Sequence, residues 1–187
     1  MERAPFEMVT KIEAAERQLA VAIRLFFERR DMIAVHNLAA DAEDVFRALG
    51  QARGIKGFYE HTDELIRPEH RKEFVNIIRS SQNFFKHAAS KDPDEKLEFY
   101  PELNPFHLFD AAFLCSELTG RYMPEILVFH AWFMTKYRDF YAAPVEKKDI
   151  FLKSLQIFDL NDFQFLIATI DRLHKHGMQT GVNTKST

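Results

Sequence analysis

Cysteine and glycine are scarce in this sequence. Among its 187 residues there are one cysteine, Cys115, and six glycines. A single cysteine cannot form an intramolecular disulfide, which is typical of the reducing cytoplasm. Six glycines and seven prolines supply little material for the tight turns of a many-stranded β fold. Strong helix formers are abundant instead, so the sequence predicts an all-α protein.

Long apolar runs are missing as well. The most apolar stretch, Ile126 to Met134, is about half of the ~20 residues that cross a bilayer and contains a histidine. The residues before Thr10 include acids and no apolar run of signal-peptide length. We therefore expect a soluble, cytoplasmic protein that makes no membrane contact. The formal net charge of −3 gives no general attraction for nucleic acid, although a local basic face is compatible with it.

Motifs for catalysis and for metal binding are also absent from the sequence. It contains no glycine-rich phosphate loop, no nucleophile elbow, no His-Glu-x-x-His and no cysteine pair for zinc. A di-iron bundle site needs Glu-x-x-His on two helices, and that spacing does not occur. We therefore expect no metal and no cofactor, and the sequence favours a protein that is not an enzyme.

Phenylalanine is the residue in surplus, with 19 copies. A phenyl ring has no hydrogen-bonding group, so this many rings need a large core, or a core together with an apolar interface. A chain of this length can bury roughly 70% of its unfolded surface in a single core. The composition therefore predicts one domain that associates with itself as a homodimer, and it identifies no other partner.

Apolar residues recur at helical spacing, and they predict one compact bundle of six to seven helices. The bundle is expected over residues 10–177, between an N-terminal tail at 1–9 and a flexible C-terminal tail at 178–187. The predicted helix at about 124–141 is apolar at nearly every angle of its helical wheel. Such a helix is surrounded by others, so we expect it to lie at the centre of the bundle.

Capping residues and breakers set the expected helix boundaries. Thr10 and Glu13 form a capping-box pattern for a first helix that runs to about Arg29. Asp31 is the expected cap of a second helix, which Gly50 ends. The later helices are expected from Pro68 to about Ser90, from the cap Asn104 to Gly120, from Pro124 to about Tyr141, from Pro144, and from the cap Asn161 to Gly177.

A polar stripe on the third predicted helix is the first candidate site. Arg79, Asn83 and His87 lie at i, i+4 and i+8, so they line one face. The stripe is extended by Lys72, Asn76 and Lys86. A face with no acid interleaved can bind phosphate, and His87 can transfer protons near neutral pH. The alternative is an ordinary solvated helix surface.

At these residues the sequence resembles the HEPN superfamily, small all-α bundles that include RNase toxins and nucleotide-binding relatives. That family places Arg, a polar residue that is often Asn, and then His on one helix; here Gln82 holds the Arg position, beside Asn83. The resemblance implies RNA or nucleotide binding by a degenerate RNase. Arg79, one turn earlier, would hold a phosphate, His87 would act as general acid or base, and Asn83 would orient His87. The whole chain is also similar in character to helical proteins of proteobacteria, which implies no activity.

Four residues near apolar helix faces form the second candidate set: His36, Asp110, Glu117 and His130. For His130 we expect a core imidazole that is hydrogen-bonded to a carboxylate or a backbone carbonyl. Asp110 and Glu117 are seven residues apart and share a helix face, so one or both can turn inward as partners for a histidine or an arginine. A buried structural network and a small-ligand or metal site both remain open, and the second requires His130, Asp110 and Glu117 to converge.

The sequence thus leaves three classes of function open. The phenylalanine surplus and the missing motifs favour a non-catalytic structural or interaction module that forms a homo-oligomer. The polar stripe supports a HEPN-like RNA- or nucleotide-binding protein instead. The third class is a small-ligand or metal binder within the bundle. The positions of the stripe and of the four apolar-face residues distinguish these hypotheses.

Overall fold

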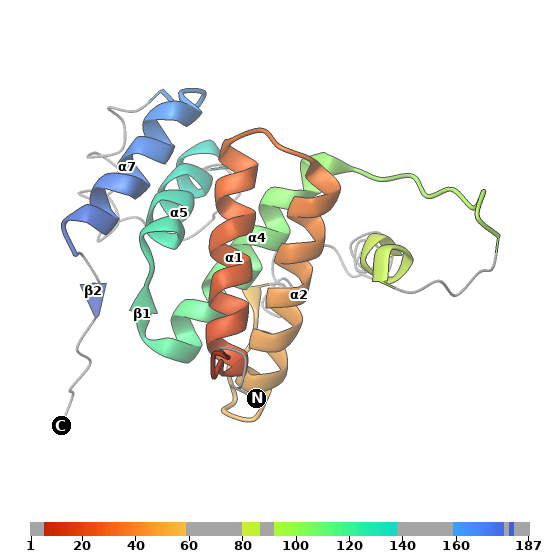
Figure 1. Cartoon of the computed structure of the whole chain (residues 1–187), viewed down its shortest axis with the longest axis horizontal. Helices are drawn as coiled ribbons and strands as arrows, with labels where there is room; N and C mark the ends of the chain where they lie inside the picture. The colour runs from red at the N-terminus through yellow and green to blue at the C-terminus, as the bar shows by residue number, and fades with distance from the viewer. Residues whose placement is uncertain (1–5, 59–79, 87–91, 138–158, 178–179, 182–187) are drawn as a thin grey trace, which may run out of the picture.

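The computed structural model describes residues 6–58, 80–86, 92–137, 159–177 and 180–181. Its helices pack side by side (Figure 1), which confirms the predicted all-α class. The labelled helices are α1 (Lys11–Phe27), α2 (Met32–Gln51), α4 (Asn104–Thr119), α5 (Pro124–Lys136) and α7 (Phe163–Lys175). Residues 80–86 are also helical, and the 3-10 turn η2 (Pro101–Leu103) leads into α4.

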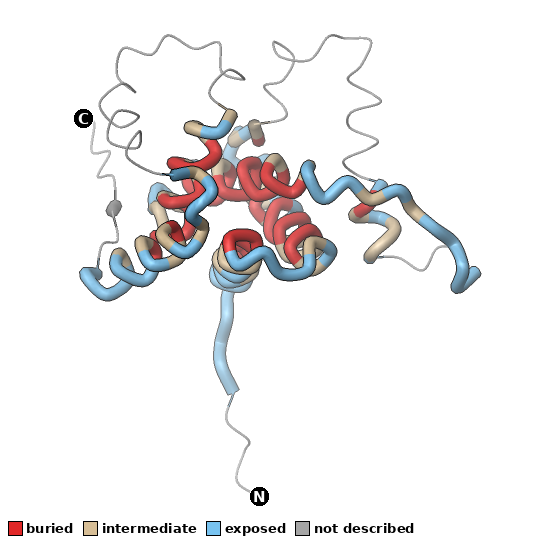
Figure 2. The backbone as a smooth tube through the Cα atoms, turned by 90° about the horizontal axis from the view of Figure 1, so that it is seen from above, coloured by how far each residue is buried: buried red, intermediate tan, exposed pale blue. Residues whose placement is uncertain are grey.

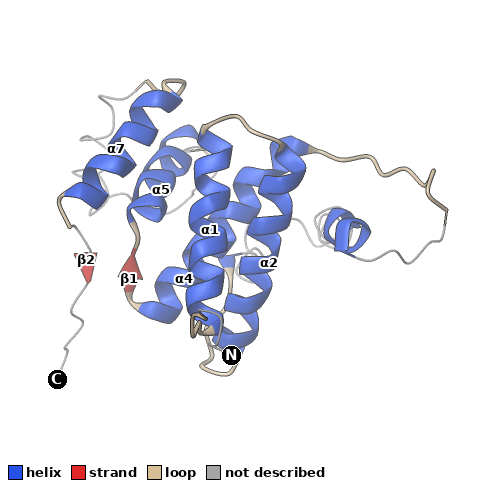
Figure 3. Cartoon of the chain, viewed as in Figure 1, coloured by secondary structure: helices blue, strands red, loops and turns tan. Residues whose placement is uncertain are grey.

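A short antiparallel β pair joins two distant parts of the described chain (Figure 3). The strands are β1 (Arg121–Tyr122) and β2 (Thr180–Gly181), with Arg121 opposite Gly181 and Tyr122 opposite Thr180. The sequence analysis predicted no strand here. The predicted helix starts at Pro68 and Pro144 lie outside the described residues.

The first two helices form the expected hairpin, with caps where the sequence places them. The Thr10 hydroxyl accepts a hydrogen bond from the Glu13 amide at 3.2 Å, and Glu13 Oε2 accepts one from the Thr10 amide at 2.8 Å. The Asp31 carboxylate accepts from the Ala34 amide at 2.9 Å, so the second cap is confirmed too. α1 ends two residues before Arg29, which adopts a positive φ of 54°.

The end of α2 differs from the prediction. The helix passes Gly50 and ends at Gln51, and Gly54 rather than Gly50 takes the left-handed conformation, with φ 72°. The chain then returns onto the helix, because the Ile55 amide donates to the Gly50 carbonyl at 3.0 Å. Gly50 is buried against Ile55 inside that turn.

Two predicted caps are wrong by one residue. Asn104 is the first residue of α4 and caps nothing, because its side chain bonds α2 instead. The cap of α7 is Asp162, whose Oδ1 accepts from the Phe165 amide at 2.9 Å, whereas Asn161 lies one residue too early. Gly120, with φ 65°, ends α4 as predicted.

The core lies where α1, α2, α4, α5 and α7 meet, and buried residues of all five helices line it (Figure 2). Phe26, Phe27, Phe129, Trp132 and Phe163 form a cluster of rings whose contacting centroids are 5.1 to 6.1 Å apart. α5 begins at Pro124 and is apolar and largely buried, as expected, but it ends at Lys136, before the predicted end at about Tyr141.

α4 shares the enclosed position that the sequence predicts for α5. It contacts α1, α2 and α5 and buries residues on all of its sides. Among the described helices, none combines the length and the hydropathy that a bilayer-spanning segment requires.

Candidate functional site

α2 and α4 pack against each other along a row of buried polar side chains. Both helices contribute polar groups to the seam, and Asp110 is completely sealed from solvent. The members of the network are His36, Glu43, Arg47, Asn104, His107 and Asp110. His36, Glu43 and Arg47 belong to α2 and lie seven and four residues apart. They therefore share one helix face, and all three contact α4.

Arg47 joins the two carboxylates of this network. Its Nη2 donates to Glu43 Oε1 at 2.7 Å and also to the Asp110 carboxylate. On its other side, Glu43 Oε2 lies 3.1 Å from His107 Nδ1. Burial alone would raise the pKa of the Glu43 carboxyl, but His107 and Arg47 together hold that pKa below its usual range. Glu43 is therefore an ionised, fully partnered group.

Gly57 covers this ion pair. A Cβ at position 57 would lie 2.9 Å from Arg47 Nη1 and 2.9 Å from Asp110 Oδ1, closer than real Cβ atoms come. Arg47 is held by two carboxylates, so its side chain cannot move aside without breaking a buried charge pair. Only glycine fits at this position.

His36 lies at the opposite end of the network. Its Nδ1 is 3.2 Å from Asn104 Oδ1, and the Asn104 amide group donates to the Met32 carbonyl at 2.8 Å. The ring makes edge contacts with three other rings, those of Phe85, Phe99 and His107. Burial, with a smaller effect of the neighbouring His107, lowers the pKa of His36 to about 4. The imidazole is therefore neutral at pH 7.

The α2–α4 network connects two neighbouring helices of the bundle. The sequence identified His36 and Asp110 as network candidates, and the structure places them in one network through Glu43, Arg47 and His107. Arg47 and His107 were missed. The available signal was their spacing, since Arg47 follows Glu43 by four residues and His107 precedes Asp110 by three.

The polar stripe is only partly within the described residues, which exclude Lys72, Asn76, Arg79 and His87. Asn83 is exposed, as predicted. Lys86 is not a free cation, because its Nζ lies 2.6 Å from Asp41 Oδ1 and 2.9 Å from Asp44 Oδ2 of α2.

The neighbours of Lys86 change the interpretation of the stripe. Burial would lower the pKa of the Lys86 ammonium, but Asp41 and Asp44 raise it. Gln82, at the position of the HEPN arginine, donates from Nε2 to Asp44 Oδ2 at 2.6 Å. Residues 80–86 contain no acid themselves, yet α2 supplies two. Gln82 and Lys86 therefore dock residues 80–86 onto α2.

His130 and Glu117 do not join Asp110. Glu117 is exposed, so of the two acids only Asp110 turns inward. The His130 ring packs 5.1 Å from Phe109 and 6.2 Å from Tyr122, and burial lowers its pKa to about 4. The expected hydrogen bond is missing at its Nε2, which is buried without a partner in the described part of the protein. Nor does any group of three or more His, Cys, Asp or Glu in those residues suit a metal ion.

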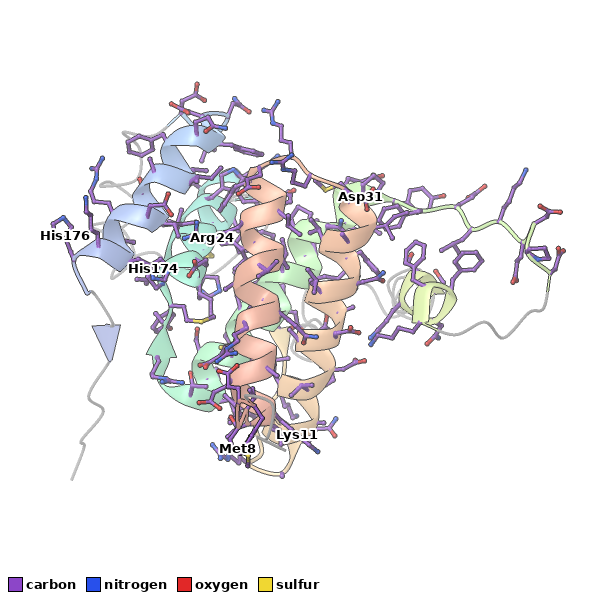
Figure 4. The ribbon with its side chains drawn as sticks, viewed as in Figure 1. Met8, Lys11, Arg24, Asp31, His174 and His176 are labelled. Atoms are coloured by element: carbon purple, nitrogen blue, oxygen red, sulfur yellow. The ribbon has the colours of Figure 1, made fainter. Side chains whose placement is uncertain are left out.

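A second polar cluster, centred on the buried Glu125 and not predicted from the sequence, ties α7 to α1 and α5 (Figure 4). The carboxylate of Glu125 is 4% exposed, and its Oε1 accepts from Arg24 Nε at 2.9 Å and lies 2.8 Å from His174 Nε2. Arg24 Nη1 also donates to Asp171 Oδ1 at 2.8 Å. Burial would lower the pKa of Arg24, but Asp171 and Glu125 raise it.

Two hollows flank the α5–α7 pair. A pocket of about 350 Å³ is bounded by α1, β1, the start of α5 and the end of α7, and Glu125 and His174 line it. A groove of about 230 Å³ runs between α5 and α7 and is lined almost entirely by apolar atoms. Leu173 borders both hollows.

No protein-family model, curated protein or solved structure matches this chain. The resemblance to the HEPN superfamily therefore receives no support from these comparisons. The fold and the contacts define the class of the protein, an all-α bundle whose helices are joined by two buried polar clusters.

Proposed function

We propose that this protein is a non-catalytic interaction module that forms a homodimer through the outer face of α5 and α7. The observation that carries the proposal is the apolar groove between these two helices. Leu160, Phe165 and Leu173 along it are only half-buried, although they pack against the core. Apolar surface that stays partly open in one chain is typical of an interface.

The position of α7 supports this assignment. α7 forms one outer edge of the bundle in Figure 1, where it packs on α5 and α1. Trp132 Nε1 donates to the Leu160 carbonyl at 3.0 Å, and the His174–Glu125 contact holds the other end of the helix. The face is therefore anchored at both ends and can meet a partner with little loss of conformational freedom.

The charges along α7 favour a second copy of this chain as the partner. Exposed acids, Asp159 and Asp162, lie at its start, and exposed bases, Arg172 and Lys175, lie in its last turn. Thirteen residues separate these ends by about 20 Å. Two copies of α7 packed antiparallel about a two-fold axis would place each acidic end against a basic end, twice in one interface.

The polar sites support an enzyme or an RNA-binding protein less well. Glu43, Arg47 and Asp110 are paired with one another inside the α2–α4 network, and Lys86 of the stripe is paired with Asp41 and Asp44. A phosphate contact would need a cation that is free to leave its acid partners.

A charge swap tests the dimer. Wild type is expected to sediment as a dimer at micromolar concentration, and Arg172→Glu and Asp159→Arg should each weaken dimerisation about tenfold or more, because each places like charges opposite one another. The double variant should recover much of the lost affinity, since it restores opposite charges. Analytical ultracentrifugation over a dilution series measures all four proteins.

Lys56→Glu is the matched control, because Lys56 is an exposed base in the turn after α2 rather than on α7. It should leave the dimer unchanged. A monomeric wild type would contradict the proposed interface. So would a double variant whose loss of dimerisation free energy equals the sum of the losses in the two single variants.

A further inference from the structure

We infer that the pocket between α1, β1 and α7 binds a small molecule that carries a primary ammonium group on an apolar body. The volume of about 350 Å³ is within the range of small-ligand sites. Ala20, Met123, Pro124 and Leu173 give it apolar walls. This site adjoins the dimer interface proposed above at Leu173, but the inference does not depend on that interface.

Glu125 is the first of two acceptors for the ammonium. Its carboxylate is almost completely buried, and both contacts it makes, with Arg24 and His174, go to Oε1. Within the described chain, Oε2 accepts no hydrogen bond, although Glu125 lines the pocket. Oε2 is not one of the buried atoms that lack a partner, so it is accessible to solvent, and a bound cation would supply it with a charged donor.

Glu16 on α1 provides the second acceptor from the opposite wall. Its side chain is 13% exposed, and its Oε1 accepts from Arg121 Nη2 at 2.8 Å. Its Oε2, like that of Glu125, has no hydrogen-bond donor among the residues described. An ammonium group carries three N–H donors, so it can bond a carboxylate oxygen of the pocket and keep further donors for a second acceptor or for water.

The charge balance around the pocket selects a cation over an anion. Arg17 forms a bidentate pair with Glu7, at 3.0 and 2.5 Å, and it is mostly exposed. Arg121 is paired with Glu16, and Arg24 is shared between Glu125 and Asp171. Each arginine is therefore already neutralised, and the carboxylates outnumber the guanidinium groups. An anion would meet unpaired carboxylate oxygens, which repel it.

The experiment compares three probes of equal length: hexylammonium, 1-hexanol and hexanoate. Titrations of the full chain are followed by two-dimensional amide NMR at neutral pH. Hexylammonium should shift resonances of Ala20, Glu125 and His174 and bind about tenfold or more tightly than hexanol, whereas hexanoate should bind least. Binding by hexanoate as strong as by hexylammonium, or no shifts with any probe at millimolar concentration, would overturn the assignment.

Two variants locate the binding. Glu125→Gln keeps a carbonyl oxygen for Arg24 and His174 but removes the charge, and it should weaken hexylammonium binding about tenfold or more. Ala20→Leu fills the pocket without altering a charged group, and it should abolish hexylammonium binding. This variant keeps the test valid if Glu125→Gln does not fold.

Ala14→Leu makes the same change at an exposed position of α1 and serves as the control, with wild-type binding expected. If Ala20→Leu binds hexylammonium as wild type does, the amine binds elsewhere and the proposal is wrong.

Discussion

At the residue scale, the buried polar groups of this protein divide into those that are paired and those that are not. Glu43, Arg47 and Asp110 satisfy one another, and Gly57 leaves them the space to do so. His130 Nε2, in contrast, is buried without a hydrogen-bond partner in the described residues. The two cases predict opposite effects of substitution, because a satisfied network is costly to disturb and an unsatisfied group is costly to keep.

Gly57→Ala should destabilise the protein by about 1 to 3 kcal/mol, since the new Cβ would press on the Arg47–Asp110 pair. Urea unfolding measures the change. Gly50→Ala is the matched control: its Cβ would meet Ile55 at an ordinary 3.4 Å, and alanine is the better helix former. It should be neutral or slightly stabilising. Equal losses of unfolding free energy in the two variants would show that the Arg47–Asp110 pair shifts to accommodate the added methyl group.

His130→Leu should keep or raise stability at pH 7, because it removes an unpartnered buried nitrogen. The folded-state pKa of about 4 lies below the ordinary 6.5, so the unfolded chain binds the proton first as pH falls. Wild type therefore loses stability between about pH 6.5 and 4, by up to ~3 kcal/mol from this residue, and the variant should lose less. Urea midpoints at pH 7 and pH 5 measure the difference.

The control for His130→Leu is His176→Leu, at an exposed position after α7. It should leave the pH dependence of the urea midpoint close to that of wild type. A marked loss of stability in His130→Leu at pH 7 would mean that the imidazole has a hydrogen-bond partner after all.

At the element scale, α7 depends on its ends more than the other helices do. Only Leu166 and Ile170 among its residues are fully buried, so its packing is limited. Its start is held by the Asp162 cap, and its end by the contact between His174 and Glu125. Because both proposed surfaces include α7, the stability of this helix matters for each of them.

Asp162→Ala should destabilise the protein by about 1 kcal/mol, because it removes the acceptor for the Phe165 amide. Asn161→Ala, one residue earlier, is the matched control and should cost much less, since its side chain does not cap the helix. Thermal or urea unfolding of both variants decides which residue is the cap. The reverse order of the two losses would restore the Asn161 cap that the sequence suggested.

At the scale of the whole molecule, the two polar clusters lie in different surroundings. The α2–α4 network connects groups within a seam that also buries the rings around His36. The Glu125 cluster lies beside an open pocket and adjoins the apolar groove at Leu173. The first is suited to holding the bundle together, and the second offers surface to a ligand or to a second chain.

The sequence by itself determined the helical class and several helix ends. Thr10, Asp31, Pro124 and Gly120 act on backbone groups within a few residues, and such local rules hold wherever the helix packs. The rules failed at Asn104, where a tertiary partner was available: the side chain that could cap α4 bonds His36 and Met32 of α2 instead.

Only the tertiary structure decided which polar groups meet. Glu43 and His107 are 64 residues apart, and Arg24 and Glu125 are 101 apart, so no spacing along the chain connects them. Their pairing depends on how each helix rotates as its apolar side enters the shared core. For the same reason Lys86 seemed a free cation in its own helix until α2 placed Asp41 and Asp44 beside it. Periodicity along the sequence identifies which face of a helix is buried. Only tertiary packing determines which residues of a neighbouring helix lie against that face.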